Sequence, residues 1–115
     1  MKATIYHNPR CSKSRATLAL LRERGIDVQI IDYLKTPPAG EAIRELIAQL
    51  GLTAADIVRS GEAAFRDSGL SLDSGDAELI ALMSREPIVM QRPVVVVGES
   101  ARIGRPPENV LELLD

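Results

Sequence analysis

The sequence is poor in the residue types that build disulfide bonds, metal sites and nucleic-acid surfaces. Its one cysteine, Cys11, and one histidine, His7, exclude an internal disulfide bond and any metal site made from Cys and His alone. The aromatic residues are Tyr6, Tyr33 and Phe65, too few to favour a surface that stacks on bases. Fourteen basic and sixteen acidic residues give a net charge of −2, without the basic excess of a duplex-binding protein. We therefore expect neither a metal nor a nucleic-acid partner.

Long apolar segments are also missing. The first ten residues, MKATIYHNPR, contain no apolar stretch of the kind that a signal peptide needs. No apolar run approaches the ~20 residues of a membrane-spanning helix. The composition, 45% hydrophobic and 26% charged, is that of a globular protein, and 115 residues suit one domain. These features predict a single cytoplasmic domain over residues 1–115 with no membrane partner.

The N-terminal third of the chain has the pattern of a strand, a helix and a second strand. Residues 3–7 predict the first strand, and leucines at helical spacing predict a helix over residues 12–24, which Gly25 ends. Residues 28–34, rich in β-branched side chains, predict the second strand. A βαβ unit over residues 1–34 favours parallel strands and a right-handed crossover.

The middle of the chain has a helical pattern, and strands return toward the C-terminus. Apolar residues recur at helical spacing within residues 39–86, which predicts an inserted helical segment. The apolar run at residues 93–97 predicts a strand, with residues 101–104 as its hairpin partner and a closing helix at 108–114. A ββα segment over residues 93–115 thus completes an α/β fold with a mixed sheet of about four strands.

Cys11 stands where the first predicted strand gives way to the first predicted helix. The free N–H groups and the positive dipole end of a helix favour a thiolate and lower the pKa of a cysteine at this place. Cys11 to Ser14 read C-x-x-S, a dithiol redox motif in which serine replaces the second cysteine, and the Ser14 hydroxyl can donate to a thiolate. The alternative is that Cys11 is a small buried apolar residue, against which its polar neighbours argue.

Other cysteine chemistries fit the pattern poorly. A cysteine phosphatase needs the loop C-x5-R, and here Thr17 stands where the arginine is required. His7 precedes Cys11 too closely to be the separately placed base of a Cys-His hydrolase. Two readings of His7 stay open: a partner that tunes the thiolate, or a satisfied histidine at the end of a strand.

Three arginines stand at the ends of predicted elements or beside proline. They are Arg59, Arg92, which precedes Pro93, and Arg105, which precedes Pro106. Arginine suits planar, bidentate binding of oxyanions. Each of the three could instead be an ordinary surface or capping arginine.

Several segments together resemble the glutaredoxin-coupled arsenate reductases, the ArsC family. The resemblance follows the family order along essentially the whole chain and implies a thioredoxin-like fold with an inserted helical segment. The segments that carry it are residues 6–15 (YHNPRCSKSR), 32–38 (DYLKTPP), 86–88 (EPI), 91–95 (QRPVV) and 104–106 (GRP).

The resemblance implies a role for each motif residue that the chain shares with the family. Cys11 matches the nucleophile. The residues that match the stabilising neighbours of its thiolate are His7, Ser14 and Arg15. The residues that match the arginines of the oxyanion and the arsenic–sulfur intermediate are Arg59, Arg92 and Arg105.

The family fold also implies a cis peptide bond before Pro93, opening the strand that faces Cys11. Pro93 stands at the first residue of its predicted strand, where a proline is tolerated. Two features depart from the best-known reductases: Ser12 and Lys13 stand where those enzymes carry Gly-Thr, and the chain stops at Asp115 without their C-terminal extension.

The function implied by the resemblance is reduction of arsenate to arsenite. The Cys11 thiolate would attack arsenate, and glutathione, a co-substrate rather than a bound cofactor, would attack the adduct and leave a mixed disulfide. Because the chain has no second cysteine to resolve that disulfide, glutaredoxin is the expected partner.

Two rival functions stay open. The first is a glutathione-dependent thiol oxidoreductase with another substrate, which would use the same thiolate. The second is a regulator related to the Spx proteins, which share the fold and bind RNA polymerase. The C-x-x-S motif and residues 104–106 favour the reductases.

Overall fold

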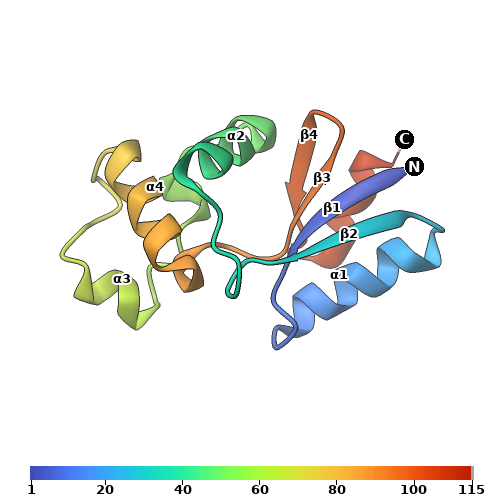
Figure 1. The fold of residues 1–115 in the computed structure, drawn as a ribbon, viewed down its shortest axis with the longest axis horizontal. Helices are drawn as coiled ribbons and strands as arrows, with labels where there is room; N and C mark the ends of the chain where they lie inside the picture. The colour runs from blue at the N-terminus through green and yellow to red at the C-terminus, as the bar shows by residue number, and fades with distance from the viewer. Residues whose placement is uncertain (115) are drawn as a thin grey trace. The chain divides into compact units, whose positions relative to one another are not determined.

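A computed structural model describes residues 1–114 and divides the chain into two compact units. One unit contains residues 1–36 and the chain from Arg92 onward, and the other contains residues 37–91. The first unit holds the sheet, and the second consists of helices and turns (Figure 1). Among the described residues, no helix is long and apolar enough to span a membrane.

The sheet unit contains four strands in the order β2-β1-β3-β4. β1 (Lys2–His7) lies parallel to β2 (Asp27–Asp32) and antiparallel to β3 (Val94–Val97), which pairs antiparallel with β4 (Ser100–Ile103). This confirms the predicted α/β fold, with a mixed four-stranded sheet of the thioredoxin-like type.

The helix α1 (Ser12–Glu23) packs on one face of this sheet beside the 3-10 helix η3 (Pro107–Leu113) (Figure 1). Alternate residues of β1 point into the core, because side chains of a strand alternate between its two faces. The fully buried members of this apolar cluster are aliphatic, as the scarcity of aromatics requires: Ile5, Leu21, Val95 and Val110.

Two element boundaries differ from the predictions in ways that affect the site. The second strand ends at Asp32 rather than at residue 34, because the Asp32 carboxylate accepts the N–H of Leu34 and its carbonyl accepts that of Lys35. Tyr33 therefore belongs to a turn and not to the strand. The closing segment is a 3-10 helix over Pro107–Leu113 rather than a helix over 108–114, and prolines at its start provide no N–H donors.

The helical unit is built around two amphipathic helices, α2 (Gly40–Leu50) and α4 (Asp76–Arg85). They pack together through buried aliphatic residues, and α2 ends at Gly51, whose φ of 69° is in the left-handed region. The shorter elements η1 (Ala55–Ile57) and α3 (Ala63–Asp67) connect them, and η2 (Pro87–Val89) follows α4.

Candidate active site around Cys11

The loop after β1 fixes the backbone of Cys11. The Cys11 N–H donates to the carbonyl of Asn8 at 3.0 Å, and the Arg10 N–H donates to the Asn8 side chain at 3.0 Å. Asn8 is itself buried, so this turn is anchored in the protein. Cys11 then occupies the N-cap position of α1, where its sulfur lies beside the free backbone N–H groups of the first turn of the helix.

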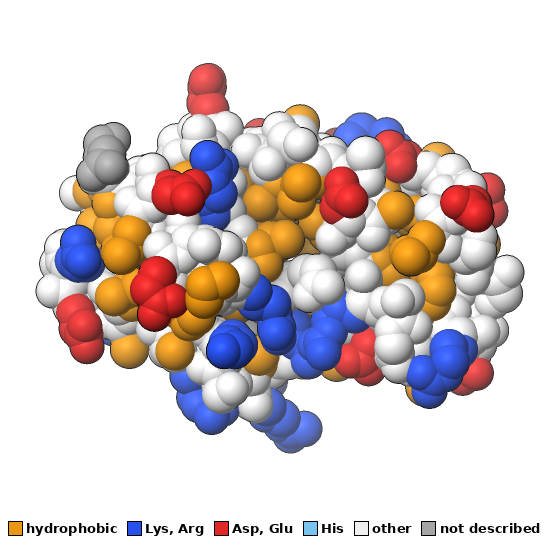
Figure 2. Space-filling model, turned by 180° about the vertical axis from the view of Figure 1, so that it is seen from behind, with side chains coloured by type: hydrophobic (Ala, Val, Ile, Leu, Met, Phe, Trp, Pro, Cys, Tyr) orange, Lys and Arg blue, Asp and Glu red, His pale blue; other side chains and the backbone are white. Residues whose placement is uncertain are grey.

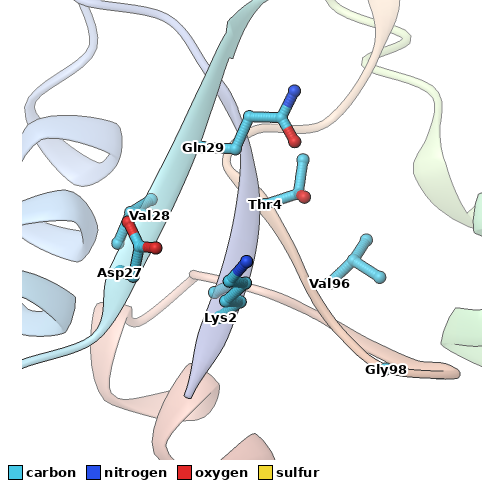
Figure 3. Close-up of a pocket in the computed structure, with 8 residues that line it drawn as sticks. Lys2, Thr4, Asp27, Val28, Gln29, Val96 and Gly98 are labelled. Carbon is cyan, nitrogen blue, oxygen red and sulfur yellow. The ribbon is translucent and has the colours of Figure 1, made fainter.

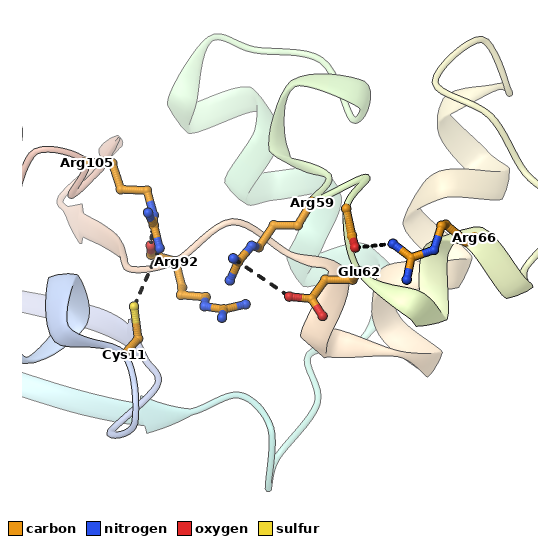
Figure 4. Close-up of polar contacts among 7 residues, drawn as sticks. Cys11, Arg59, Glu62, Arg66, Arg92 and Arg105 are labelled. Carbon is orange, nitrogen blue, oxygen red and sulfur yellow. Dashed lines mark hydrogen bonds and ion pairs between the residues drawn. The ribbon is translucent and has the colours of Figure 1, made fainter.

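Several donors converge on the Cys11 sulfur. Partial burial raises the pKa of the thiol, but hydrogen bonds from the Ser14 backbone, the Arg92 side chain and the Lys13 backbone lower it, as does the nearby Arg105 charge. The net pKa lies below the ordinary value. Figure 4 shows the Arg105 guanidinium reaching the sulfur, with Nη2 at 3.5 Å from Sγ. Such surroundings favour the nucleophilic thiolate.

Arg92 and Arg105 are connected through the backbone. Arg105 Nε donates to the Arg92 carbonyl at 2.7 Å, and the Gly104 N–H donates to the Pro93 carbonyl at 2.9 Å. The Arg92–Pro93 peptide bond is cis, which confirms the prediction, and the Arg105–Pro106 bond is cis as well, which was not predicted. The two arginine–proline segments thus form one hydrogen-bonded unit beside the sulfur.

Gly104 is required where β4 leaves the sheet. A Cβ atom on this residue would lie 2.5 Å from Thr17 Oγ1 and 2.8 Å from Pro93 Cγ, closer than real contacts allow. Thr17 is fully buried and donates to the Lys13 carbonyl at 2.8 Å, so moving it away would disturb the core and this hydrogen bond. The close approach of these three residues sets the start of the segment that carries Arg105.

His7 and Ser14 contact each other rather than the sulfur. His7 Nδ1 and Ser14 Oγ lie 2.6 Å apart, and the Asn8 N–H donates to the same hydroxyl oxygen at 3.0 Å. Burial lowers the pKa of His7, with Arg22 and Arg15 adding to this effect and Asp32 opposing it. The His7 imidazole contacts the Ser14 hydroxyl, while Ser14 acts on the Cys11 sulfur through its backbone N–H and not through that hydroxyl.

Arg15 supports the same loop from outside. Its Nη1 donates to the Pro9 carbonyl at 2.9 Å, so the guanidinium is placed against the turn before Cys11. The groups that act on the pKa of Cys11 include Arg92 and Arg105 and do not include Arg15. If Arg15 contributes to the stability of the thiolate, as predicted, it acts through the loop that it supports and not directly on the sulfur.

Arg59 belongs to the helical unit. Its N–H donates to the Val89 carbonyl at 2.6 Å, and its guanidinium forms an ion pair with Glu62 at 3.8 Å (Figure 4). A cavity of about 430 Å³ opens beside this pair and is lined by Val58, Arg59, Ser60, Gly61, Glu62 and Gln91. The role of Arg59 at the sulfur stays a prediction.

Cavities open at both ends of the parallel strand pair β1 and β2. One, of about 490 Å³, opens at the start of β1 and β2, among Lys2, Thr4, Asp27 and Gln29 (Figure 3), and contains none of the predicted site residues. The other, of about 320 Å³, adjoins the loop before Cys11 and is lined by Asn8, Pro9, Arg10, Asp32, Leu34 and Lys35. Its position makes it the cavity more relevant to the cysteine.

Charges of both signs are distributed over the molecular surface. The face in Figure 2 carries both basic and acidic side chains. Within residues 1–114, no three His, Cys, Asp or Glu side chains gather closely enough to hold a metal ion.

The sequence reasoning missed three residues that shape the site. Asn8 closes the loop, and its place just after a strand and before proline was a usable signal. Gly104 was quoted only as part of a motif, although a glycine next to arginine and proline can mark a close approach. Tyr33 was assigned to a strand, and its surroundings depend on residues distant in sequence, which no local pattern reports.

The sheet order β2-β1-β3-β4, with Cys11 at the start of α1, is that of a thioredoxin-like protein. The model of the ArsC family matches residues 6–113, and the chain belongs to this family.

Its relatives include proteins of similar length and longer reductases. The chain is 46% identical over 112 residues to the uncharacterized protein YfgD of Escherichia coli K12, covering 96% of this chain and 94% of the relative. It is 42% identical over 115 residues to an arsenate reductase of Rhizobium meliloti, covering 99% and 82%. The structure of an arsenate reductase from Vibrio cholerae superposes with a TM-score of 0.93 at 46% identity, covering 97% of each chain.

Proposed function

We propose that this protein is an arsenate reductase in which the Cys11 thiolate is the nucleophile and glutathione and glutaredoxin are the reductants. The observation that carries the proposal is the convergence of backbone N–H groups, Arg92 and Arg105 on one sulfur of lowered pKa. Membership of the ArsC family and about 40% identity to arsenate reductases support arsenate as the substrate.

The first chemical step forms a sulfur–arsenic bond. The Cys11 thiolate attacks the arsenic(V) atom of arsenate, and one oxygen ligand leaves as water after protonation. Arg92 and Arg105 hold the remaining oxygens, because a guanidinium can donate two parallel hydrogen bonds to an oxyanion. The donors that lower the pKa of Cys11 also raise the fraction of the thiol that is present as the nucleophilic thiolate.

The second step is the reduction. The thiolate of glutathione attacks the Cys11 sulfur, an S–S bond forms, and the S–As bond breaks with its electron pair going to arsenic, which leaves as arsenic(III). A glutaredoxin thiol then attacks the mixed disulfide and releases the Cys11 thiolate. Since the chain has one cysteine, the resolving sulfur comes from another molecule. This chemistry places the protein in a reducing compartment, and we propose the cytoplasm.

A coupled assay tests the proposal. Arsenate-dependent oxidation of NADPH is measured with glutathione, glutaredoxin and glutathione reductase supplied, and Cys11→Ser is the negative control. We expect multiple turnovers with the natural chain and none with Cys11→Ser. Intact mass after treatment with arsenate and glutathione should show one glutathione on the natural chain.

Two results would favour the rival functions. Activity on a thiol-linked substrate together with no arsenate turnover would support another glutathione-dependent oxidoreductase. Capture of RNA polymerase without any turnover would support a regulator. Efficient turnover with thioredoxin as the sole reductant, and no glutathione adduct, would contradict the proposed reductant.

A further inference from the structure

Tyr33 lies at the same edge of the sheet as the active-site loop. β1 and β2 are parallel and in register, with His7 opposite Asp32, so both strands end at this edge. Asn8 follows one strand and Tyr33 follows the other. The turn begun by Asp32, whose carboxylate accepts the Leu34 N–H at 3.2 Å, fixes the backbone on either side of the tyrosine.

The Tyr33 side chain is buried to an unusual degree for a tyrosine in a turn. It is 1% exposed, and its hydroxyl has no hydrogen-bond partner of standard geometry among the described residues. An unsatisfied buried hydroxyl costs free energy that a phenylalanine would not incur. A hydroxyl kept at such a position therefore points to a role other than stability.

The polar groups around the hydroxyl belong to the site of Cys11. Burial raises the pKa of Tyr33 to about 12, opposed by the charge of Arg92 and by hydrogen bonding toward the Arg92 and Asn8 side chains, while Cys11 adds to the increase. The phenol is consequently neutral throughout the physiological pH range. Its contact with Arg92 lacks standard hydrogen-bond geometry, as is common for catalytic contacts before substrate binds.

We propose that Tyr33 is a positioning residue whose phenolic oxygen orients the Arg92 guanidinium toward the Cys11 sulfur and the oxyanion bound there. This inference deepens the proposed function and rests on it for the identity of the anion. A neutral oxygen suits the position, because a carboxylate beside Cys11 would repel both the thiolate and the oxyanion. The phenol directs the guanidinium without adding negative charge.

The test begins with Tyr33→Phe, which removes only the hydroxyl. We expect the fold to keep its stability in urea, because the removed group makes no standard hydrogen bond. We expect the pKa of Cys11, measured by alkylation rate against pH without arsenate, to rise, since Arg92 no longer donates to the sulfur in its best orientation. The KM for arsenate should increase roughly fivefold to tenfold.

Making the same substitution in an Arg92→Ala chain separates positioning of Arg92 from a general structural effect. In an Arg92→Ala chain, Tyr33→Phe should leave the pKa of Cys11 unchanged, because the group through which it acts is gone. A shift of similar size with and without Arg92 would overturn the inference, as would a Tyr33→Phe chain whose Cys11 pKa and KM match those of the natural chain.

Tyr6→Phe is the matched control, since it removes the hydroxyl of the other tyrosine in the sheet unit. Tyr6 is not among the groups that act on the pKa of Cys11, so that pKa should not move in this variant. The alkylation measurements also separate the inference from the proposed function. If the natural chain reduced no arsenate, an Arg92-dependent shift in Tyr33→Phe would still support the positioning role, and the absence of that shift would overturn it.

Discussion

The sheet unit and the helical unit hold their candidate anion-binding arginines in different ways. In the sheet unit, Arg105 donates to the Arg92 carbonyl at 2.7 Å and to the Cys11 sulfur at 3.5 Å. In the helical unit, Arg59 pairs with the carboxylate of Glu62 at 3.8 Å. Arg105 contacts a backbone carbonyl and the candidate reacting sulfur itself, so its guanidinium already lies where an anion would react, whereas the charge of Arg59 is shared with a carboxylate. We therefore expect the sheet unit to supply most of the anion affinity.

The largest effect should follow loss of the bidentate geometry in the sheet unit. Arg92→Lys keeps the charge but removes the planar fork, so we expect an intact fold, a Cys11 pKa still below the ordinary value, and an arsenate kcat/KM about 100-fold lower. Arg59→Lys is the matched change in the helical unit and should reduce kcat/KM roughly tenfold. Steady-state kinetics of both variants measure the difference. Equal losses would remove the distinction between the units, and full activity of Arg92→Lys would contradict the geometry of the site.

The next effect concerns packing rather than charge. Gly104→Ala would force a Cβ atom against Thr17 Oγ1 and Pro93 Cγ, and we expect it to lower the free energy of unfolding by about 1–3 kcal/mol and to reduce arsenate turnover. Gly61→Ala, in the helical unit, is the control, because no atom lies within 4 Å of a Cβ there. Urea denaturation should separate the two variants. Equal free energies of unfolding for the two variants would contradict the close packing at Gly104.

A pH dependence of stability should accompany the lowered pKa of Cys11. A thiol whose pKa is lower in the folded than in the unfolded state stabilises the fold fully above the unfolded value of ~8.5. That contribution disappears as pH falls through the lower folded pKa. The stability difference between the natural chain and Cys11→Ser should therefore shift in favour of the natural chain as pH rises through this range. Denaturation at several pH values measures it, and a difference that stays constant with pH would contradict the lowered pKa.

The smallest effect is expected for an exposed ion pair of the sheet unit. Arg102 Nε and Glu112 Oε2 lie 3.0 Å apart, but their side chains are 42% and 65% exposed. Solvent screens such a pair, so Glu112→Gln should change the free energy of unfolding by less than about 1 kcal/mol and leave kcat/KM unchanged. A thermal melt in low and high salt checks this. A larger loss of stability or of kcat/KM would contradict the expectation that solvent screens this pair.

Features that depend on local patterns or on the family resemblance could be predicted from the sequence. The strand–helix–strand order, the position of Cys11 and the cis bond before Pro93 depend on local patterns or on the family resemblance, and the structure agrees with them. The end of β2 was predicted two residues late, because the Asp32 side chain redirects the backbone and hydrophobic pattern alone does not report such turns.

Contacts between residues distant in sequence could not be predicted from local sequence patterns. The Ser14 hydroxyl was expected to serve the thiolate, yet it is bound to His7 and Asn8, and only the folded loop brings those groups together. The link from Arg105 to the Arg92 carbonyl joins segments thirteen residues apart in sequence through the geometry of a hairpin. Such pairings follow from tertiary packing, which local propensity does not determine.

The contact between His7 and Ser14 has an evolutionary consequence. Ser14 is fully buried, and its side chain points to the imidazole and to the Asn8 N–H, while its backbone N–H serves Cys11. A cysteine acquired at this position would first place its sulfur inside that buried network, at the expense of the hydrogen bonds that hold the loop. A second cysteine at position 14 would thus require accompanying changes at positions 7 and 8, so a single substitution there would weaken the loop that holds Cys11.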